Sequence, residues 1–316
     1  MSKITCYTFM KTHNKAFIYA GLAILFWSTV ATAFKLALRY LNFLELLMYA
    51  SITSTILLFF ILLFQGKLHL IKTQSSSNLF RSSVMGLLNP FLYYIILFKA
   101  YSLLPAQVAQ PLNMVWPIVL VFLSIPLLKQ KVSTRSFIAL FISFIGVYFI
   151  STQGDLLKPG NSNPLGVGLA LGSSVIWSLF FIYNVRDNRN EEVKLFLSFL
   201  FATVFIVLTN IITGNIQAPP LKGLVAAIYT GCFEMGITFV FWLKALRISK
   251  SASRISIYVY LAPFLSLVFI HIFVGEYIYL TTIAGLVLII TGILVQKLRL
   301  KKRIAVNLID DEKKNY

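Results

Sequence analysis

The 316-residue sequence is poor in the residues from which catalytic and metal sites are usually built. It has three histidines and two cysteines, Cys6 in a polar tail and Cys232 inside an apolar run. Two cysteines in such different surroundings predict neither a disulfide framework nor a thiolate metal site. The motifs HExxH, GxSxG, CxxC and the P-loop are also absent from the sequence. We therefore expect no enzyme of the common hydrolase or nucleotidase classes, no catalytic residue, no metal and no cofactor.

Charged residues are scarce too, at 12 %, whereas hydrophobic residues make up 58 % and the mean hydropathy is +0.83. These values exclude an ordinary soluble domain and a disordered chain, and they predict an all-α polytopic membrane protein. The net charge of +18 comes from Lys and Arg in short connections between apolar runs, which is the positive-inside pattern of membrane proteins. We expect the lipid bilayer and a small-molecule substrate as partners, and no nucleic acid. A homodimer is an open alternative to a monomer.

One long pattern occurs twice in the chain. Its clearer copy runs from Lys244 to Glu276 as KALRISKSASRISIYVYLAPFLSLVFIHIFVGE. About 20 apolar residues, enough to span a bilayer, are interrupted there by Pro263. A shift of 146 residues places Pro117 on Pro263 and Ala106 on Ala252. This internal duplication predicts two repeats of the same architecture.

Each repeat contains five apolar runs of suitable length. The predicted spans are residues 16–34, 44–64, 83–103, 107–128 and 134–150, followed by 165–185, 193–212, 223–246, 253–274 and 278–296. The first run resembles a signal peptide, with Ala31-Thr32-Ala33 as a cleavage site, but it is long for one. Since Trp27-Ser28 recurs as Trp177-Ser178, we interpret the run as a membrane span.

These spans divide the chain into five regions. We expect a cytoplasmic tail at 1–15, the first repeat at 16–150, a polar linker at 151–164, the second repeat at 165–297, and a basic then acidic cytoplasmic tail at 298–316. About 23 of the 28 Lys and Arg residues fall on the side of the N-terminus, so both termini are predicted to be cytoplasmic, in an inner (plasma) membrane. Five spans per repeat make the repeats inverted, which places a substrate near the membrane midplane between them.

Polar residues on the paired spans indicate the substrate cavity. Asn89 aligns with Glu234 between the third and eighth spans, and Gln110 and Asn113 share one face of the fourth span. Because polar side chains are costly in lipid, they should face the protein interior, either in a cavity or in helix packing. Tryptophans deep in the runs could wall the same cavity. The candidate cavity residues are Glu234, Asn89, Tyr93, Gln110, Asn113, Trp116, Trp27, Trp177, Thr238, Ser256 and Tyr260.

Glu234 is the most informative ionisable residue, because it lies about midway along an apolar run without a nearby cation in sequence. We interpret it as a ligand for a substrate ammonium group or as a proton-coupling site, with a neutral packing carboxyl as the alternative. His271 is a second candidate for proton coupling, although a single histidine there is also typical of an interface. Pro117 and Pro263 are predicted to be gating hinges, because they interrupt equivalent spans.

The stretch from Lys244 to Glu276 resembles the hallmark of EamA-type carriers of the drug/metabolite transporter superfamily, in which an Ala-Leu-Arg turn, a proline-broken helix and a final Gly-Glu recur in this order. The resemblance covers nearly the whole chain. It implies about ten helices, a central cavity and alternating access. Asn113-Met114-Val115-Trp116-Pro117 resembles an element of the bacterial aromatic amino-acid exporter branch. The first repeat departs from the pattern at Lys129-Gln130, and the second span has Ser51 where many relatives have Arg.

These observations predict a secondary-active transporter that exports an amino acid or a related amphipathic metabolite. A cavity with aromatic rings, amides and one carboxyl suits an ammonium group attached to an apolar side chain. An uptake exchanger for a larger metabolite, such as S-adenosylmethionine or a nucleotide-like compound, is the first alternative, with Lys99 and Lys244 as candidate anion ligands. A membrane-embedded enzyme is a remote one.

Overall fold

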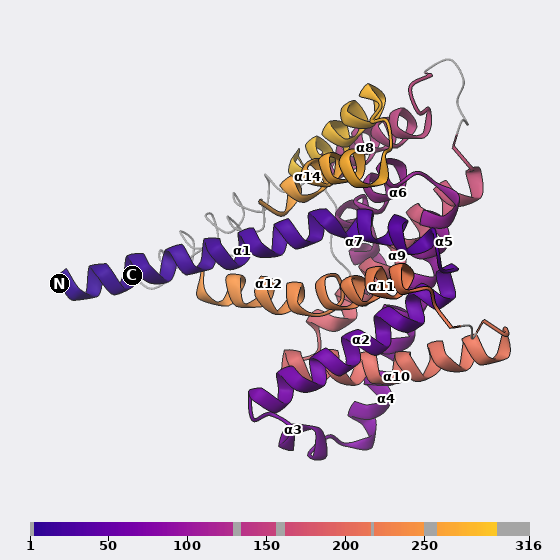
Figure 1. Cartoon of the computed structure of the whole chain (residues 1–316). Helices are drawn as coiled ribbons and strands as arrows, with labels where there is room; N and C mark the ends of the chain where they lie inside the picture. The colour runs from indigo at the N-terminus through magenta and orange to yellow at the C-terminus, as the bar shows by residue number, and fades with distance from the viewer. Residues whose placement is uncertain (1–2, 129–133, 156–161, 216–217, 250–257, 296–316) are drawn as a thin grey trace.

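The computed structural model describes residues 3–128, 134–155, 162–215, 218–249 and 258–295, and in these ranges the chain forms helices and no strand (Figure 1). The elements of the first half are α1 (Lys3–Leu38), α2 (Phe43–Phe64), α3 (His69–Lys72), α4 (Ser76–Gly86), the π-helix η1 (Leu87–Leu92), α5 (Tyr93–Leu103), α6 (Ala106–Asn113), α7 (Trp116–Leu128) and α8 (Thr134–Ser151). Those of the second half are α9 (Pro164–Val185), α10 (Glu191–Ile212), α11 (Leu221–Phe233), α12 (Ile237–Ile248), the 3₁₀ turn η2 (Val259–Leu261), α14 (Ala262–Phe269), the π-turn η3 (Ile270–Val274) and a last helix at Leu280–Val295.

Ten apolar helical segments follow one another along the described chain. Seven of them are long and apolar enough to cross a membrane, and the segments Ser136–Ser151, Val259–Val274 and Leu280–Val295 are shorter. Large apolar side chains such as Phe141 and Phe144 are about two-thirds exposed, as lipid-facing positions should be. The prediction of an all-α polytopic membrane protein is confirmed.

Two helices begin earlier than the hydrophobic runs predict. The first helix starts at Lys3 instead of residue 16, and the third span starts at Ser76 instead of residue 83. The side chain of Ser75 accepts a hydrogen bond from the Asn78 amide at 3.3 Å and so caps α4. A helix can therefore extend into polar sequence that a hydropathy argument assigns to a loop.

Equivalent residues of the two halves make equivalent contacts. Gly86 lies against the backbone of Ser198, and Gly231 lies in the same way against the backbone of Ala50. At both places a Cβ atom would overlap the facing carbonyl oxygen. Gly86 corresponds to Gly231, and Ala50 corresponds to Ser198 when the capping residues of α2 and α10, Asn42 and Asn190, are aligned. Exchanging the halves therefore turns one contact into the other. The two halves are thus related by an approximate two-fold rotation.

The last helices of the halves cross in the same symmetric manner. A Cβ at Gly146 would lie 2.6 Å from the carbonyl oxygen of Gly285, and one at Gly292 would lie 2.7 Å from that of Ala139. These two contacts also correspond to each other when the halves are exchanged. Only glycine permits such a close approach of two helix backbones, which is a common way to pack helices in a membrane.

Two groups of helices lie on either side of α1 and α9. In the first group α2 packs on α10 and α11, and α10 packs on α4; in the second group α6 packs on α8 and α14. Figure 1 shows α2, α10 and α4 on one side of α1 and α12, and α14, α8 and α6 on the other. The helix α1 contacts α11, α12 and α14, whereas α9 contacts α5, α6 and α7. Each of these two helices therefore packs mainly against helices of the half of the chain to which it does not belong.

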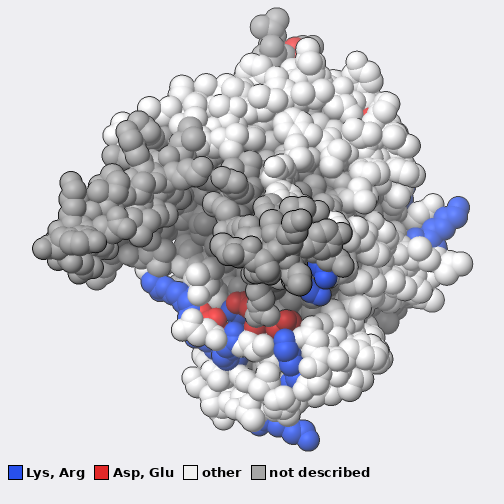
Figure 2. Space-filling model, turned by 90° about the vertical axis from the view of Figure 1, so that its left-hand side faces the viewer, with Lys and Arg blue, Asp and Glu red and all other residues white. Residues whose placement is uncertain are grey.

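Charged side chains gather at the end of the molecule where α1 begins (Figure 2). There Arg189 binds the buried carboxylate of Asp187 at 2.6 Å and donates to the carbonyl of Asn78 and the hydroxyl of Ser82, both at 2.9 Å. Burial opposes the charge of Asp187, but the hydrogen bonds from Arg189 and the charges of Arg189 and Arg81 hold the pKa of that carboxyl below its usual range. The connection between α9 and α10 is thereby fixed to α4.

Candidate functional site

The third and eighth spans are both interrupted at corresponding residues. Asn89 has extended backbone angles (φ −148°, ψ 121°) within η1, between α4 and α5. Glu234 ends α11, and Gly236 (φ −123°, ψ −97°) precedes α12. Interrupted helices expose backbone and side-chain polar groups near the middle of a membrane, where transporters bind their substrates. The two interruptions bring one amide and one carboxyl into the interior.

Two sets of hydrogen bonds, made by adjacent tyrosines of the third span, connect that span to the eighth span and to the fourth and sixth spans. The Tyr94 hydroxyl donates to Glu234 Oε1 at 3.0 Å, and the neighbouring Tyr93 hydroxyl donates to Asn113 Oδ1 at 3.3 Å. Asn113 Nδ2 in turn donates to Ser173 Oγ at 2.8 Å. We call these five residues the central cluster. They come from both halves of the chain, so the cluster exists only when the halves pack together.

Aromatic rings surround the central cluster. The ring of Trp177 lies 5.0 Å from that of Tyr93, 6.4 Å from that of Trp116 and 6.1 Å from that of Phe239. Phe239 also lies 5.8 Å from Trp27. The two tyrosines of the cluster are buried, whereas these three tryptophans and Phe239 are only partly buried. Partly buried rings next to a carboxyl can pack against an apolar group or hold a cation over their faces.

Two amide oxygens close to the cluster in sequence have no hydrogen-bond partner among the residues that the structure describes. They are Asn89 Oδ1, one helical turn before Tyr93, and Gln110 Oε1, one turn before Asn113; both are buried. Since buried polar atoms are rarely left unpaired, these oxygens indicate places for water or for donor groups of a ligand.

The predicted cavity residues divide into three groups. Six of them are linked by hydrogen bonds or ring contacts, either directly or through Tyr94 and Phe239: Glu234, Tyr93, Asn113, Trp116, Trp27 and Trp177. Asn89 and Gln110 lie beside them. Thr238 is buried and donates to the Phe233 carbonyl, so it bridges the interruption of its own span. Tyr260 is buried in η2 on the ninth span, and Ser256 lies outside the described residues.

The predicted hinge prolines lie at the starts of two helices, and the second residue predicted for proton coupling is exposed. Pro117 and Pro263 are each the second residue of a helix, α7 and α14 respectively, so their missing N–H groups leave no helical hydrogen bond unmade. The interruption of the fourth span lies just before, at Met114 and Val115. His271 is exposed, and its Nδ1 lies 3.0 Å from the backbone oxygen of Glu276.

Sequence reasoning missed four residues of this site. Tyr94 and Ser173 belong to the central cluster, and Phe239 and Trp242 complete the aromatic wall, with Trp242 at 5.4 Å from Trp27. Tyr94 follows Tyr93 directly, but helical spacing puts neighbours on different faces, so only one of the two was expected to point inward. In the structure one binds Asn113 and the other binds Glu234.

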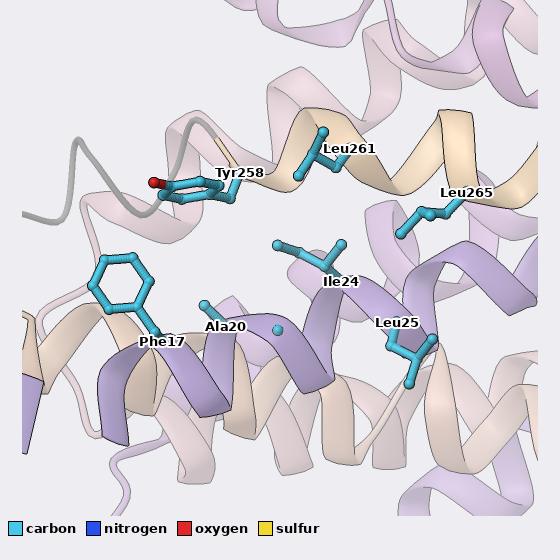
Figure 3. A pocket seen from close by; sticks show the side chains of 8 residues that line it. Phe17, Ala20, Ile24, Leu25, Tyr258, Leu261 and Leu265 are labelled. Carbon is cyan, nitrogen blue, oxygen red and sulfur yellow. The ribbon is translucent and has the colours of Figure 1, made fainter. Parts of the chain in front are cut away.

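A separate groove of about 400 Å³ lies between α1 and α14 (Figure 3). Phe17 and Tyr258 face each other at one end, with ring centroids 5.8 Å apart, and Leu25 and Leu265 lie at the other. Its lining is almost entirely apolar and comes from segments that span the membrane. It lacks the polar groups that a metabolite site needs.

In the described part of the chain, no group of three or more His, Cys, Asp or Glu residues is arranged for a metal ion.

The two-fold related halves and the polar cluster at interrupted helices define a membrane transporter built from repeats. The chain belongs to the EamA-like transporter family, whose profile matches residues 14–152 and again 164–296.

Proteins similar to this chain are also named as transporters. An uncharacterized transporter of Bacillus subtilis, YvbV, is 27 % identical over 66 % of this chain and 69 % of its own length. An uncharacterized transporter of Archaeoglobus fulgidus is 24 % identical over 88 % of this chain and 97 % of its own length. One crystal structure, at 21 % identity, shares the fold with a TM-score of 0.64 and covers 92 % of this chain and 99 % of its own.

Proposed function

We propose that the protein is a secondary-active carrier that exports small amphipathic metabolites with an ammonium group, amino acids foremost, by alternating access. The observation that carries the proposal is the central cluster, in which one carboxyl, Glu234, is held by a tyrosine at an interrupted helix. The proposed binding site is the space between Glu234 and the partly buried rings of Trp27, Trp177 and Phe239.

The chemistry of the site supports an ammonium group. None of the described ion pairs includes Glu234, so no cation among the described residues competes with a ligand for its carboxylate. The surrounding rings can contact an apolar side chain and interact with a cation over their faces. The unpartnered oxygens of Asn89 and Gln110 add two acceptors for N–H groups.

The placement of the two candidate lysines argues against the anion exchanger. Lys99 Nζ lies over the ring of Phe43 at 5.0 Å, and Lys244 Nζ lies over that of Tyr19 at 4.7 Å. Neither has a described contact with the central cluster. A site for a nucleotide-like anion would require Lys or Arg among its ligands.

We also propose that proton coupling resides at Glu234, which must release either a proton or a substrate ammonium before the site empties. The exposed His271 binds only a backbone oxygen among its described contacts, which supports a structural role for it. An inner (plasma) membrane location with both termini in the cytoplasm is supported by the excess of Lys and Arg in the N-terminal segment and in the connections assigned to the same side.

Flux measurements in proteoliposomes test this function. Purified protein is reconstituted with a labelled aromatic amino acid, and efflux is followed with and without a proton gradient. Two unlabelled competitors are compared: the deaminated analogue of the same amino acid and a nucleotide-like anion. We expect the amino acid to be transported and the deaminated analogue to compete at least about tenfold less well, because a buried carboxyl left without its ammonium partner is costly. Equal competition by the analogue, or preferred transport of the anion, would contradict the proposal.

A further inference from the structure

The short helix α6 is attached at its N-terminus to the other half of the chain. Glu276, from the segment after the ninth span, accepts hydrogen bonds from the backbone amides of Ala106 at 2.8 Å and Gln107 at 3.1 Å. These amides belong to the first turn of α6 and have no partner within the helix. A carboxylate at this position also interacts favourably with the helix dipole.

The side chain of Gln107 strengthens the same attachment. Its Nε2 donates to the Tyr277 carbonyl at 2.6 Å, and its Oε1 accepts from the Tyr279 amide at 3.2 Å and the Thr282 hydroxyl at 3.1 Å. Gln107 is 2 % exposed, so these bonds are shielded from water. Five hydrogen bonds therefore fix the start of α6 to residues 276–282 of the second half.

The opposite end of α6 lies in the central cluster. The helix has eight residues, so its ends are only about 10 Å apart. Its last residue, Asn113, binds both Tyr93 and Ser173, and Gln110 presents its unpartnered oxygen one turn earlier. A displacement of the first turn of so short a helix is transmitted to Asn113, because the chain is interrupted directly afterwards at Met114 and Val115.

We propose that Glu276 is a positioning residue for substrate binding: by fixing the N-terminus of α6, it holds Gln110 and Asn113 in the geometry of the binding site. This proposal rests on the proposed transport function. Glu276 does not touch the substrate and acts only through α6.

The sequence itself suggests the test variant. Gln130 occupies in the first repeat the position that Glu276 occupies in the second. The substitution Glu276→Gln keeps the size of the side chain but leaves one acceptor oxygen and introduces an NH₂ group. One of the two amides of α6 then faces a donor. The matched control is Glu191→Gln, which removes a carboxylate at the N-terminus of α10, away from the cluster.

Hydrogen exchange tests the structural part of the proposal without any substrate. In nanodiscs, the peptide that contains residues 106–113 should exchange at least about fivefold faster in Glu276→Gln than in the wild type or in Glu191→Gln, because a first-turn hydrogen bond is lost. Unchanged exchange in α6 would overturn the proposal, and this outcome does not depend on whether the protein transports the substrate tested.

Transport kinetics test the functional part. Glu276→Gln should raise the KM about fivefold or more at nearly unchanged maximal rate, whereas a general loss of stability lowers the amount of active protein and so the maximal rate. In a Gln110→Ala/Asn113→Ala background the same substitution should raise the KM less than twofold, because both residues through which it acts are gone. Additive effects, or an effect on the maximal rate alone, would overturn the proposal. Failure of the wild type to transport an amino acid would instead contradict the proposed function.

Discussion

The interruptions of the third and eighth spans lie at corresponding positions but differ in backbone conformation and in chemistry. Each follows a glycine that packs on a carbonyl of the facing helix, Gly86 on Ser198 and Gly231 on Ala50. At the interruption itself the first half has Asn89, whose oxygen has no partner among the described residues, and the second half has Glu234, whose carboxyl binds Tyr94. The comparison teaches that the glycine packing and the place of the interruption are shared by both repeats, while the ionisable group is present in only one of them.

The substitution Glu234→Gln should have the largest effect. It removes the carboxylate that we assign to the substrate ammonium, so transport should fall about 10- to 100-fold and lose its pH dependence. The counterpart Asn89→Ala should reduce transport less than about fivefold and leave the pH profile unchanged, because only one neutral acceptor is lost. Proteoliposome flux between pH 5.5 and 8.5 measures both. If Glu234→Gln transports at an unchanged rate and with an unchanged pH profile, the comparison has no functional meaning.

Alanine at the paired glycines should break the packing that the two halves share. In Gly86→Ala and in Gly231→Ala, the new Cβ would overlap a backbone oxygen, which should cost about 1–3 kcal/mol of unfolding free energy in each case. Unfolding in detergent, followed by circular dichroism, should show similar losses for both. Gly21→Ala is the control, because no atom lies within 4 Å of the added Cβ. A large loss in only one of the paired variants would contradict the two-fold relation.

Removing the hydroxyl group of one tyrosine at a time distinguishes the roles of the neighbours Tyr93 and Tyr94. Tyr94→Phe leaves Glu234 without its donor and should shift the pH profile of transport and change the KM by about fivefold, as expected for about 1 kcal/mol. Tyr93→Phe affects Asn113 instead and should leave the pH profile in place. Identical pH profiles of the two variants would show that Tyr94 does not act on Glu234.

The paired prolines should have the smallest effect on stability. Each is the second residue of its helix, where alanine fits the backbone equally well, so Pro117→Ala and Pro263→Ala should change the unfolding free energy by less than about 1 kcal/mol. If the prolines act as gating hinges, the transport rate changes more than the stability does. Wild-type transport in both variants would refute the gating role.

Much of the architecture could be predicted from the order of residues alone. Apolar runs predict ten helical segments, because an unpaired backbone in lipid is too costly, and in the described residues seven of these segments are long enough to cross a membrane and three are shorter. The recurrence of Pro117 as Pro263 and of Trp27 as Trp177 shows the duplication directly. Glu234 is also recognisable, since a carboxyl inside an apolar run is expensive unless it has a function.

Tertiary structure alone decided which polar groups meet. Tyr94 reaches Glu234 across 140 positions of sequence, and Asn113 reaches Ser173 across 60, and no local periodicity encodes such pairings. The interruption at Asn89 and the cap that Glu276 provides for α6 likewise depend on packing between the halves. Hydropathy and helical spacing report which face of a helix avoids lipid, but the partner of that face is set by how two-fold related halves fit together.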